Sequence, residues 1–347
     1  MKTIAIDCRF AATNSGLGRY TRELTTHLLS RDGFRYVLFV RSPEENWIPS
    51  RSSHFTVVTA DVPHYSIAEQ VVLPGLLRDF PADLFFSPHF NVPFSCPVPF
   101  LVTIHDLILH RYPNQASFFK RRAYRSLFSN AIKKATRIIT ISPFVKSEIA
   151  SVFGTSAESK TRVVLEGVDP AFHPSPQPAL ERIRDKYALK RPYFLYVGNA
   201  KQHKNVPLLI QAFLASGRQM DADLILVTGG KESEALRPLP DHVRQLKDVP
   251  DSDLPALYSA ANALVTASLY EGFCLPVAEA LACACPVIAT DGSAIRDIAT
   301  GKALLLEPTV DAFAAAFKHP PHERNASVIG TWENTAEETA AVLQEAM

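Results

Sequence analysis

Short apolar runs alternate with longer helical or loop segments along the first half of the chain. The runs that predict strands are Thr3–Ile6, Tyr36–Val40, Thr56–Thr59, Leu84–Ser87, Phe100–Ile104, Ile138–Ile141 and Val163–Leu165. Fully apolar runs of this length suit strands that are buried on both faces. The alternation therefore predicts a parallel sheet with helices on both of its faces.

The alternation pauses between Gly167 and Pro192, where several prolines punctuate a loop and a short charged helix. We interpret this stretch as a linker between domains. The pattern then restarts, and it predicts strands at Tyr193–Val197, Asp223–Thr228, Ala263–Ala267 and Pro286–Ala289. Because 347 residues exceed the size at which single cores stop growing, we expect two doubly wound domains with a site in the cleft between them.

The stretch from Glu271 to Thr290 combines an acidic loop, a helix and a buried strand. Pro276 fits the first helical turn, where its missing N–H would have no partner anyway. We expect unpaired amides at this helix start to bind an anion; they belong to Cys274, Leu275, Val277 and Ala278. Glu279 lies one turn further on, where its carboxylate can accept two hydrogen bonds from a ribose diol. The alternative is a capped core helix with two solvated acids, Glu271 and Glu279.

A glycine-containing loop follows the first predicted strand. The loop runs from Asp7 to Gly18 and ends in Ser15-Gly16-Leu17-Gly18, and we expect a helix from Arg19 to Ser30. Strand, glycine loop and helix form the phosphate-binding unit of doubly wound folds. With two glycines and a longer loop than the dinucleotide fingerprint, the pattern is equally compatible with a plain turn and a C-cap glycine.

Polar residues stand directly after two other predicted strands. His105 and Asp106 follow Phe100–Ile104, at the strand end where open α/β sheets bind ligands, so His105 is either a site residue or a structural histidine. His89 has a similar placement. In the second half, Lys201 and Lys204 follow Tyr193–Val197, and each is either a diphosphate-binding cation or a solvated loop lysine.

The segment Phe118–Arg137 carries only positive charges, interleaved with aromatic and aliphatic residues. Its cations are Lys120, Arg121, Arg122, Arg125, Lys133, Lys134 and Arg137. A basic helix of this kind either lies on an anionic membrane or binds an acidic acceptor. The alternative is an ordinary amphipathic helix that covers the sheet.

Composition limits the partners and the compartment. The net charge of +1 implies no bulk attraction to nucleic acid or membrane. No apolar run approaches the roughly 18 residues of a spanning helix, and the first residues lack a signal-peptide pattern, so we expect a cytoplasmic protein. We expect its five cysteines to be reduced and mostly buried. Asp221-Ala222-Asp223 precedes a strand and Asp251-Ser252-Asp253 caps a helix, so we expect no metal site there.

Taken together, the motifs resemble those of the retaining GT-B enzymes of glycosyltransferase family 4. The residues that carry the resemblance are Gly16-Leu17-Gly18-Arg19-Tyr20, His105-Asp106, Tyr196-Val197-Gly198, Lys204-Asn205, Leu257 to Ala261, Glu271 to Pro276, Glu279, Pro286 to Ile288 and Trp332. The start of the chain is similar to that of bacterial mannosyl- and rhamnosyltransferases that build O-antigen and other surface polysaccharides.

The resemblance implies an α/β, GT-B fold with two Rossmann-like doubly wound domains facing across a cleft. Residues 1–172 would form the acceptor domain and residues 173–330 the nucleotide-sugar donor domain, and residues 331–347 would form a helix that crosses back to the first domain. By position, Glu279 would hold the ribose and Lys204 the diphosphate. Glu271 and the amides of Phe273 to Leu275 would hold the sugar. Four further positions carry over: Gly198 in the donor site, Gly16 and Gly18 near the phosphates, and His105 near the anomeric carbon.

The function implied is transfer of a hexose, with mannose from GDP-mannose as the first candidate, to a hydroxyl of a glycan or lipid-linked acceptor. The resemblance implies no metal and no cofactor, and the basic segment Phe118–Arg137 would face the acceptor or the inner face of the cytoplasmic membrane. Fixed positive charge would stabilise the departing diphosphate, and the acceptor would attack from the same face. The alternatives are a nucleotide-sugar epimerase or hydrolase with the same fold, or a binding module without activity.

The chain departs from the family pattern at four positions. Asn199 and His203 stand where relatives have arginine, so diphosphate binding would rest on Lys204, with Lys201 as a second candidate. Cys274 and Ala284 stand where glycine is common. We expect the side chain of Cys274 to affect sugar specificity.

Overall fold

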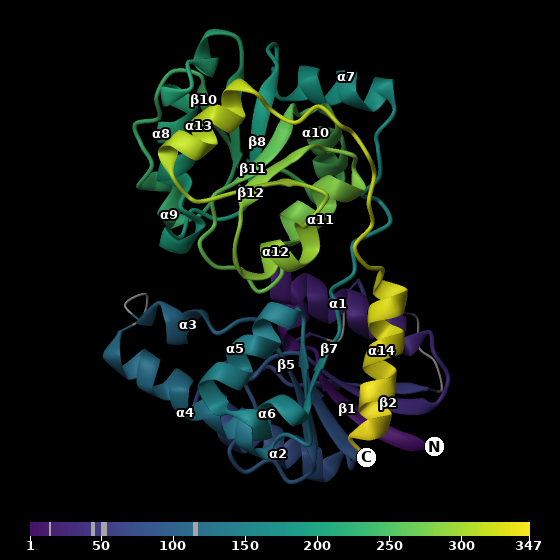
Figure 1. Cartoon of the computed structure of the whole chain (residues 1–347). Helices are drawn as coiled ribbons and strands as arrows, with labels where there is room; N and C mark the ends of the chain where they lie inside the picture. Colours follow the sequence, from purple (N-terminus) through teal and green to yellow (C-terminus); the bar gives the residue numbers. More distant parts are fainter. Residues whose placement is uncertain (14, 43–45, 50–53, 114–116) are drawn as a thin grey trace. The chain divides into compact units, whose positions relative to one another are not determined.

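The structure is a computed structural model that describes residues 1–13, 15–42, 46–49, 54–113 and 117–347. It divides into two compact units (Figure 1). Unit 1 comprises Met1–Gly167 together with Trp332–Met347, and unit 2 comprises Val168–Thr331. Each unit is built around one parallel sheet covered by helices, so the predicted α/β class with two Rossmann-like doubly wound domains is confirmed.

The described part of unit 1 holds a seven-stranded sheet in the order β3-β2-β1-β4-β5-β6-β7, with parallel neighbours throughout. The strands are β1 (Lys2–Asp7), β2 (Phe34–Val40), β3 (Phe55–Thr59), β4 (Leu84–Ser87), β5 (Phe100–Ile104), β6 (Arg137–Thr140) and β7 (Thr161–Val163). The chain runs outward from β1 to β3 and then returns to the other side of β1 with β4. The carboxyl ends of β1 and β4 therefore flank the switch point of this sheet, the place where open α/β sheets bind ligands.

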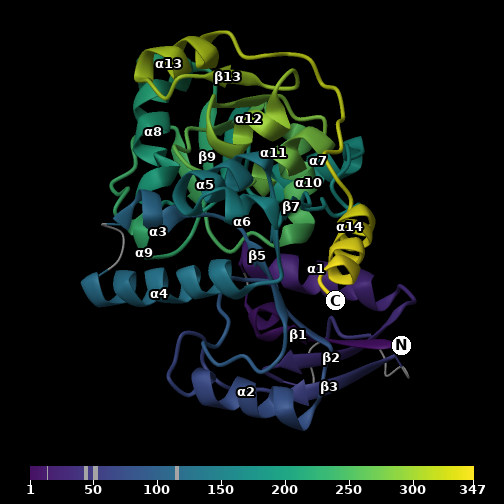
Figure 2. The same ribbon diagram turned by 60° about the horizontal axis from the view of Figure 1, so that its bottom comes forward.

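Helices from both ends of the chain cover the sheet of unit 1. They are α1 (Gly16–Leu29), α2 (Glu69–Asp79), α3 (Ile108–Arg111), α4 (Phe118–Lys134), α5 (Pro143–Phe153), α6 (Thr155–Ser159) and the last helix, α14 (Trp332–Glu345). Figures 1 and 2 both show α14 beside α1. The contact is made by two buried aromatic rings, those of Tyr20 and Trp332, with centroids 5.9 Å apart. Burying such rings is among the larger contributions a side chain makes to stability.

The described part of unit 2 holds a six-stranded parallel sheet in the order β10-β9-β8-β11-β12-β13. Its strands are β8 (Tyr193–Val197), β9 (Asp223–Val227), β10 (Val243–Leu246), β11 (Ala263–Thr266), β12 (Val287–Thr290) and β13 (Leu304–Leu306). The strand order reverses between β8 and β11. The loops that follow these two strands are therefore the expected place for a ligand.

Helices also cover both faces of the second sheet. They are α7 (Gln177–Lys186), α8 (Val206–Ala215), α9 (Lys231–Glu234), α10 (Leu254–Ala260), α11 (Leu275–Ala282), α12 (Ser293–Ala299) and α13 (Val310–Lys318). Figure 1 shows α8 and α13 together on one side of the strands. There the buried rings of Phe194, Phe213 and Phe317 pack edge to face, with centroids between 4.8 and 6.3 Å apart.

The interpretation of Gly167–Pro192 as a linker is wrong for most of its length. The boundary between the units falls at its first residue, and the remainder belongs to unit 2. Its helix α7 is fastened by ion pairs from Arg182 and Lys186 to Asp253, with N–O distances of 3.2 and 2.5 Å. Asp253 is 2% exposed, so these cations compensate a buried charge, which also accepts a hydrogen bond from the Tyr187 hydroxyl at 2.7 Å.

Two predicted boundaries also differ from the structure. β7 ends at Val163, where the predicted strand begins. The first helix begins at Gly16 rather than at Arg19, because the hydroxyl of Ser15 accepts a hydrogen bond from the Gly18 N–H at 3.1 Å and so caps the helix. Gly16 and Gly18 therefore belong to the first helical turn, and the C-cap interpretation of these glycines is wrong.

Candidate functional site

The two loops at the switch point of unit 2 meet in one ion pair. Lys204 lies at the end of the loop after β8, and Glu271 lies in the loop after β11. The Lys204 Nζ is 2.6 Å from the Glu271 Oε1, and the side chains are only 20% and 10% exposed. A backbone bond joins the same loops, because the Leu269 N–H donates to the His203 carbonyl at 2.7 Å. The structure therefore brings together the lysine that the resemblance assigns to the diphosphate and the glutamate that it assigns to the sugar.

The start of α11 adjoins Glu271 and has an unusual backbone. Cys274 is its N-cap residue, with φ of +80° in the left-handed region that favours glycine. The Cys274 carbonyl accepts hydrogen bonds from the N–H groups of Val277 and Ala278 at 3.0 and 3.4 Å. The prediction that these two amides point freely at an anion is therefore wrong. The amides of residues 273 to 275 precede those bonds and remain the candidates.

Glu279 lies inside α11 and is 3% exposed. Its Oε2 accepts a hydrogen bond from the Tyr258 hydroxyl at 2.9 Å, and burial together with the carboxylate raises the pKa of Tyr258 well above its ordinary value. Glu271 is also buried, at 9% exposed. The alternative of two solvated acids is therefore wrong, since both carboxylates are held inside unit 2 by specific partners.

His203 contributes no positive charge to this site near neutral pH. Its side chain is buried, and burial together with the adjacent Lys204 ammonium lowers the pKa of the imidazole to about 4. Lys201 is exposed and is not part of the Lys204–Glu271 ion pair. Of the charges on the loop after β8, that of Lys204 is therefore the one that the structure directs at the switch point.

Gly198 begins the same loop, and its backbone conformation requires glycine. Its φ is +147°, and a Cβ at this position would lie 3.2 Å from the Tyr196 hydroxyl oxygen. That hydroxyl is occupied, because it donates to the Asn199 carbonyl at 2.6 Å. A side chain at residue 198 would meet this turn, so glycine allows the loop to fold back over Tyr196.

The two glycines of α1 differ in what surrounds them. A Cβ on Gly18 would lie 2.0 Å from the Thr13 carbonyl oxygen, so glycine is required for packing at this position. A Cβ on Gly16 would meet no atom within 4 Å. Gly16 therefore leaves open space at the start of a helix that follows β1, at the switch point of unit 1.

His105 follows β5 and is held on three sides within unit 1. Its Nε2 is 2.9 Å from the Pro88 carbonyl oxygen, and its Nδ1 is 3.3 Å from Oε1 of Glu166. The Tyr20 ring lies edge-on to the imidazole at 4.6 Å. Both ring nitrogens thus face acceptors, an arrangement that fixes the ring orientation. Glu166 is 5% exposed and was missed by the sequence reasoning, although it follows a predicted strand just as His105 does.

His89 is packed among the rings of Phe10, Phe90 and His105. Burial and the neighbouring His105 lower the pKa of His89 well below its ordinary value. We therefore interpret His89 as a neutral packing residue.

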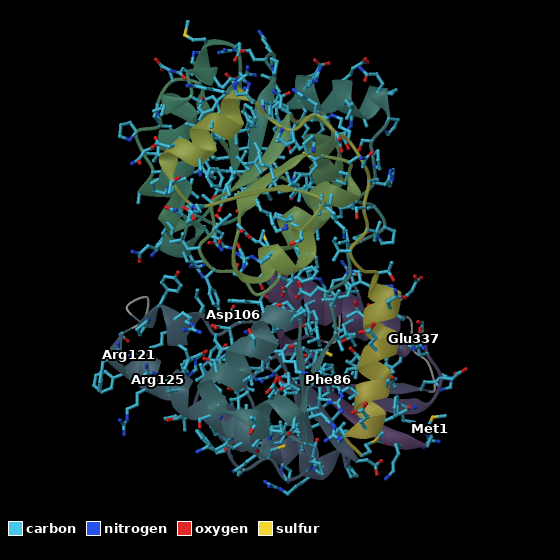
Figure 3. All side chains as sticks on the ribbon, viewed as in Figure 1. Met1, Phe86, Asp106, Arg121, Arg125 and Glu337 are labelled. Carbon is cyan, nitrogen blue, oxygen red and sulfur yellow. The ribbon has the colours of Figure 1, made fainter. Side chains whose placement is uncertain are left out.

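The basic segment forms α4 up to Lys134, and Arg137 begins β6. The alternative of an amphipathic helix that covers the sheet is confirmed for the buried side of α4. One side of the helix packs into the core of unit 1 through Tyr124, Leu127 and Phe128. The other side is polar, and at its start Phe118 and Phe119 are 61% and 82% exposed. Figure 3 shows Arg121 and Arg125 projecting outward from this helix. No helix in the described residues has the length and apolar character needed to cross a membrane.

Neither Asp-x-Asp pair is arranged as a metal site. Asp221 pairs with Arg218 at 2.9 Å, and Asp223 lies 3.3 Å from Arg191. Asp253 is engaged by α7. Across the part of the chain that the structure describes, no three His, Cys, Asp or Glu residues are grouped as a metal would require.

Models of two glycosyltransferase families match the two halves of the chain. The model of "Glycosyltransferase Family 4" matches residues 14–172, and the model of "Glycosyl transferases group 1" matches residues 180–324. The chain belongs to glycosyltransferase family 4. The two matches cover most of unit 1 and most of unit 2 in turn.

Two curated members of the family are similar in sequence. O-antigen chain mannosyltransferase B of Escherichia coli is 31% identical over 251 residues, which are 69% of this chain and 65% of that protein. O-antigen chain mannosyltransferase RfbU of Salmonella typhimurium is 30% identical over 216 residues, which are 60% of this chain and 56% of that protein. The matches thus span less than two thirds of either relative's length.

A solved structure with a similar fold supports the fold assignment. The Anabaena protein Alr3699/HepE, determined in complex with UDP and glucose, superposes with a TM-score of 0.76 at 15% identity and covers 99% of this chain and 100% of its own. At this identity the likeness concerns the fold alone.

Proposed function

We propose that this family 4 protein is a retaining glycosyltransferase that moves a hexose from a nucleotide-sugar to a hydroxyl of a glycan or lipid-linked acceptor in surface polysaccharide synthesis. Mannose from GDP-mannose is the first candidate donor. The support comes from the similarity to two O-antigen chain mannosyltransferases and from the site at the switch point of unit 2. Alr3699/HepE, which has a similar fold, was determined in complex with UDP and glucose, which is consistent with a nucleotide-sugar in such a fold.

The observation that carries the proposal is the ion pair between Lys204 and Glu271. A compact ammonium group held at the carboxyl ends of β8 and β11 is suited to a diphosphate, which would take over the lysine from the carboxylate. Glu271 would then be released to accept hydrogen bonds from hydroxyls of the transferred sugar. Glu279, whose Oε2 already accepts from Tyr258, would meet the ribose.

The chemistry would rest on stabilisation of the leaving diphosphate. The Lys204 charge and the amides of residues 273 to 275 would face the oxygens on which negative charge develops, and fixed dipoles of this kind contribute roughly 3 kcal/mol each to lowering a barrier. His105 would orient the sugar rather than remove a proton, because both of its nitrogens already face acceptors. The acceptor hydroxyl would then attack from the face that the diphosphate leaves, with no metal and no cofactor.

The alternative activity is that of a nucleotide-sugar epimerase or hydrolase with the same fold. Such an enzyme needs carboxylates that exchange protons around the sugar. The two carboxylates at the switch point are instead engaged by an ammonium group and by a phenol. This arrangement favours the transferase.

We also propose that the protein contacts the inner face of the cytoplasmic membrane through α4. Exposed Phe118 and Phe119 stand at the start of a helix whose outer side is basic. Aromatic side chains beside lysine and arginine are typical of segments that lie in the membrane interface. The contact would bring a lipid-linked acceptor to unit 1.

Binding of nucleoside diphosphates tests the proposed donor site most simply. Thermal-shift measurements with GDP, UDP, ADP and dTDP should show one nucleotide that raises the unfolding temperature, because a ligand that binds only the folded state stabilises it. The matching nucleotide-sugar should do the same. If none of the four raises the unfolding temperature, the proposed donor site is wrong.

A further inference from the structure

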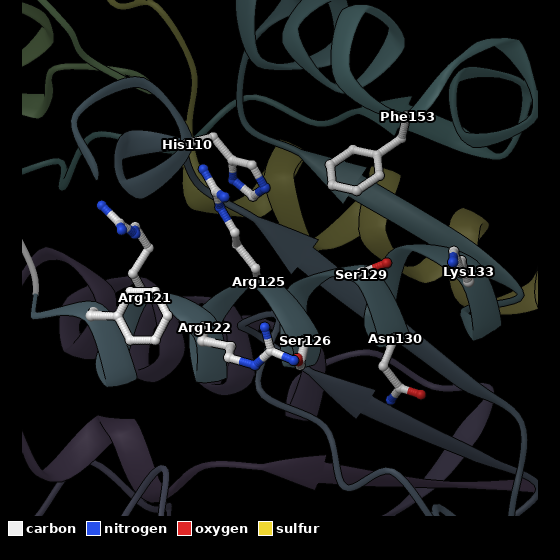
Figure 4. Close-up of a pocket in the computed structure, with 10 residues that line it drawn as sticks. His110, Arg121, Arg122, Arg125, Ser126, Ser129, Asn130, Lys133 and Phe153 are labelled. Atoms are coloured by element: carbon white, nitrogen blue, oxygen red, sulfur yellow. The ribbon is translucent and has the colours of Figure 1, made fainter. Parts of the chain in front are cut away.

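An open groove of about 720 Å³ runs along the outer side of α4. It is lined from three neighbouring elements of unit 1: His110 of α3, Phe153 at the end of α5, and one side of α4 itself (Figure 4). The α4 residues that line it are Phe118, Arg121, Arg122, Arg125, Ser126, Ser129, Asn130 and Lys133. We refer to this feature as the α4 groove.

Four cations line the α4 groove, and no described carboxylate lies within ion-pair distance of them. They are Arg121, Arg122, Arg125 and Lys133. Arg121 instead places its guanidinium 5.8 Å from the centre of the Phe118 ring. Four positive charges along one side of a single helix repel one another, so an anion in the groove would be stabilised by all of them.

One carboxylate stands near the groove, and it is already neutralised. Glu148 of α5 is 8% exposed and forms a two-pronged ion pair with Arg111, in which the Arg111 Nε lies 2.6 Å from Oε2 of Glu148. His110 is affected by these charges, since burial together with Arg125 and Arg111 lowers the pKa of its imidazole. The electrostatic potential inside the groove is therefore positive, even though Glu148 lies close by.

The groove also has apolar walls that a free counter-ion would not use. The rings of Phe118 and Phe153 border the cations (Figure 4). Guanidinium groups bind phosphate oxygens in pairs, whereas aromatic rings pack against hydrocarbon. Together these surfaces match a phosphate ester that carries an apolar chain.

We propose that the α4 groove binds the phosphate or diphosphate group of a lipid. The arginines would hold the phosphate oxygens, and Phe118 and Phe153 would pack against the first carbons of the lipid chain. This assignment rests on the proposed function, because it makes the groove the place where a lipid-linked acceptor is held while its glycan reaches the donor site. The same chemistry could be supplied by the headgroup of a membrane phospholipid.

A short amphiphilic diphosphate in solution tests the site without a bilayer. Farnesyl diphosphate serves as the probe, and calorimetry on the full-length protein measures its affinity. The variant Arg121→Gln, Arg122→Gln, Arg125→Gln should bind it roughly tenfold more weakly or worse, since each lost charge-assisted hydrogen bond weakens binding. Inorganic pyrophosphate, which lacks the chain, should bind the groove more weakly than farnesyl diphosphate does.

A matched variant and a second ligand separate this test from the proposed donor site. Arg35→Gln, Arg78→Gln, Lys146→Gln removes the same charge from unit 1 outside α4 and outside the groove lining, and it should bind the probe like the native protein. Each variant should keep its affinity for the nucleoside diphosphate of the donor site, which also shows that it folds. All titrations with farnesyl diphosphate are run with the donor-site nucleotide at saturating concentration, so that the probe cannot bind at Lys204.

Vesicles distinguish the two sources of the phosphate. If the groove variant loses farnesyl diphosphate but still sediments with vesicles of phosphatidylglycerol and phosphatidylcholine, the site belongs to the acceptor carrier. If the groove variant loses both farnesyl diphosphate binding and sedimentation with the vesicles, the groove also binds the headgroups of membrane phospholipids. The proposal that it binds a lipid phosphate then still holds. Unchanged affinity for farnesyl diphosphate in the groove variant, or equal loss in the matched variant, would overturn the proposal.

Discussion

Lys204 and Glu271 are 67 residues apart in the chain and form an ion pair with an N–O distance of 2.6 Å. The pair lies at the reversal of strand order in unit 2 and is mostly screened from water. It holds the lysine extended in place before any ligand arrives, so little side-chain entropy remains to be lost on binding. It also makes binding an exchange, in which phosphate oxygens replace a carboxylate.

This relationship predicts a selective loss in Lys204→Ala. Nucleoside diphosphate binding should weaken by roughly tenfold or more because a charge-assisted contact is lost, whereas binding of the free nucleoside should change little. Calorimetry with both ligands gives the comparison. Equal losses for the two ligands would contradict the assigned role.

Two controls accompany that variant. Lys204→Ala leaves Glu271 buried without its partner, so the double variant with Glu271→Gln separates lost binding from lost stability. Lys201→Ala removes an exposed lysine of the same loop and should leave diphosphate affinity near the native value.

The end of α11 predicts a stabilising substitution. Ala284 has φ of +54°, the Ala284 N–H donates to Leu281, and the Cys285 N–H donates to Ala280 at 2.9 Å, which together form a helix C-terminal motif that favours glycine. Ala284→Gly should raise the free energy of unfolding by about 0.5–1 kcal/mol, because it removes left-handed strain. Urea unfolding measures this. Ala282→Gly, two residues earlier inside the helix, should lower it, and a matching loss in Ala284→Gly would contradict the account.

Acid should destabilise the protein in part through His203. Its pKa is about 4 in the folded protein, below the ordinary value near 6.5 of an unfolded chain, so the unfolded state binds the proton first. The free energy of unfolding should therefore fall as the pH drops from about 6.5 to about 4. His203→Gln should reduce this fall, and exposed His322→Gln should not. An identical pH dependence in native protein and His203→Gln would show that His203 is not buried in the neutral form.

Glu166 should act on catalysis through His105. Glu166→Gln keeps the size of the side chain but removes the charge facing the imidazole Nδ1. If His105 orients the sugar, kcat should fall by roughly tenfold while the donor KM stays the same, the pattern expected when a group acts mainly in the transition state. Glu158→Gln, on α6 of the same unit, is the control. A change in KM alone would assign Glu166 to binding instead.

The central strands and the strand-end residues could be predicted from the sequence because apolar runs are a local signal. The two edge strands of the unit 2 sheet were not predicted. β10 reads Val243-Arg244-Gln245-Leu246 and has no apolar run, whereas β13 is apolar but only three residues long. The contact between Lys204 and Glu271 could not be predicted either, because it depends on how two long loops fold over neighbouring strands.

The resemblance to the family identified positions at which this chain differs, and the structure gives a physical reason for two of them. It marked Cys274 and Ala284 as replacements of glycine, and the structure gives the reason for glycine, since both have positive φ. It also marked His203, but the neutral state of this histidine depends on burial that only the structure shows. Glu166 was missed because its contact with His105 joins residues that follow two different strands, and the sequence alone does not show that they lie together.

The reaction itself is the most direct test of the proposed function. Proton NMR of the anomeric signals follows GDP-mannose, or the donor selected by the nucleotide panel, incubated with the protein alone and then with a mannose-terminated glycan. We expect the donor to persist until the glycan is added, and then to be consumed with release of the nucleoside diphosphate and appearance of a product with the donor's anomeric configuration. Conversion of the donor to its epimer without an acceptor, or a product of inverted configuration, would contradict the account.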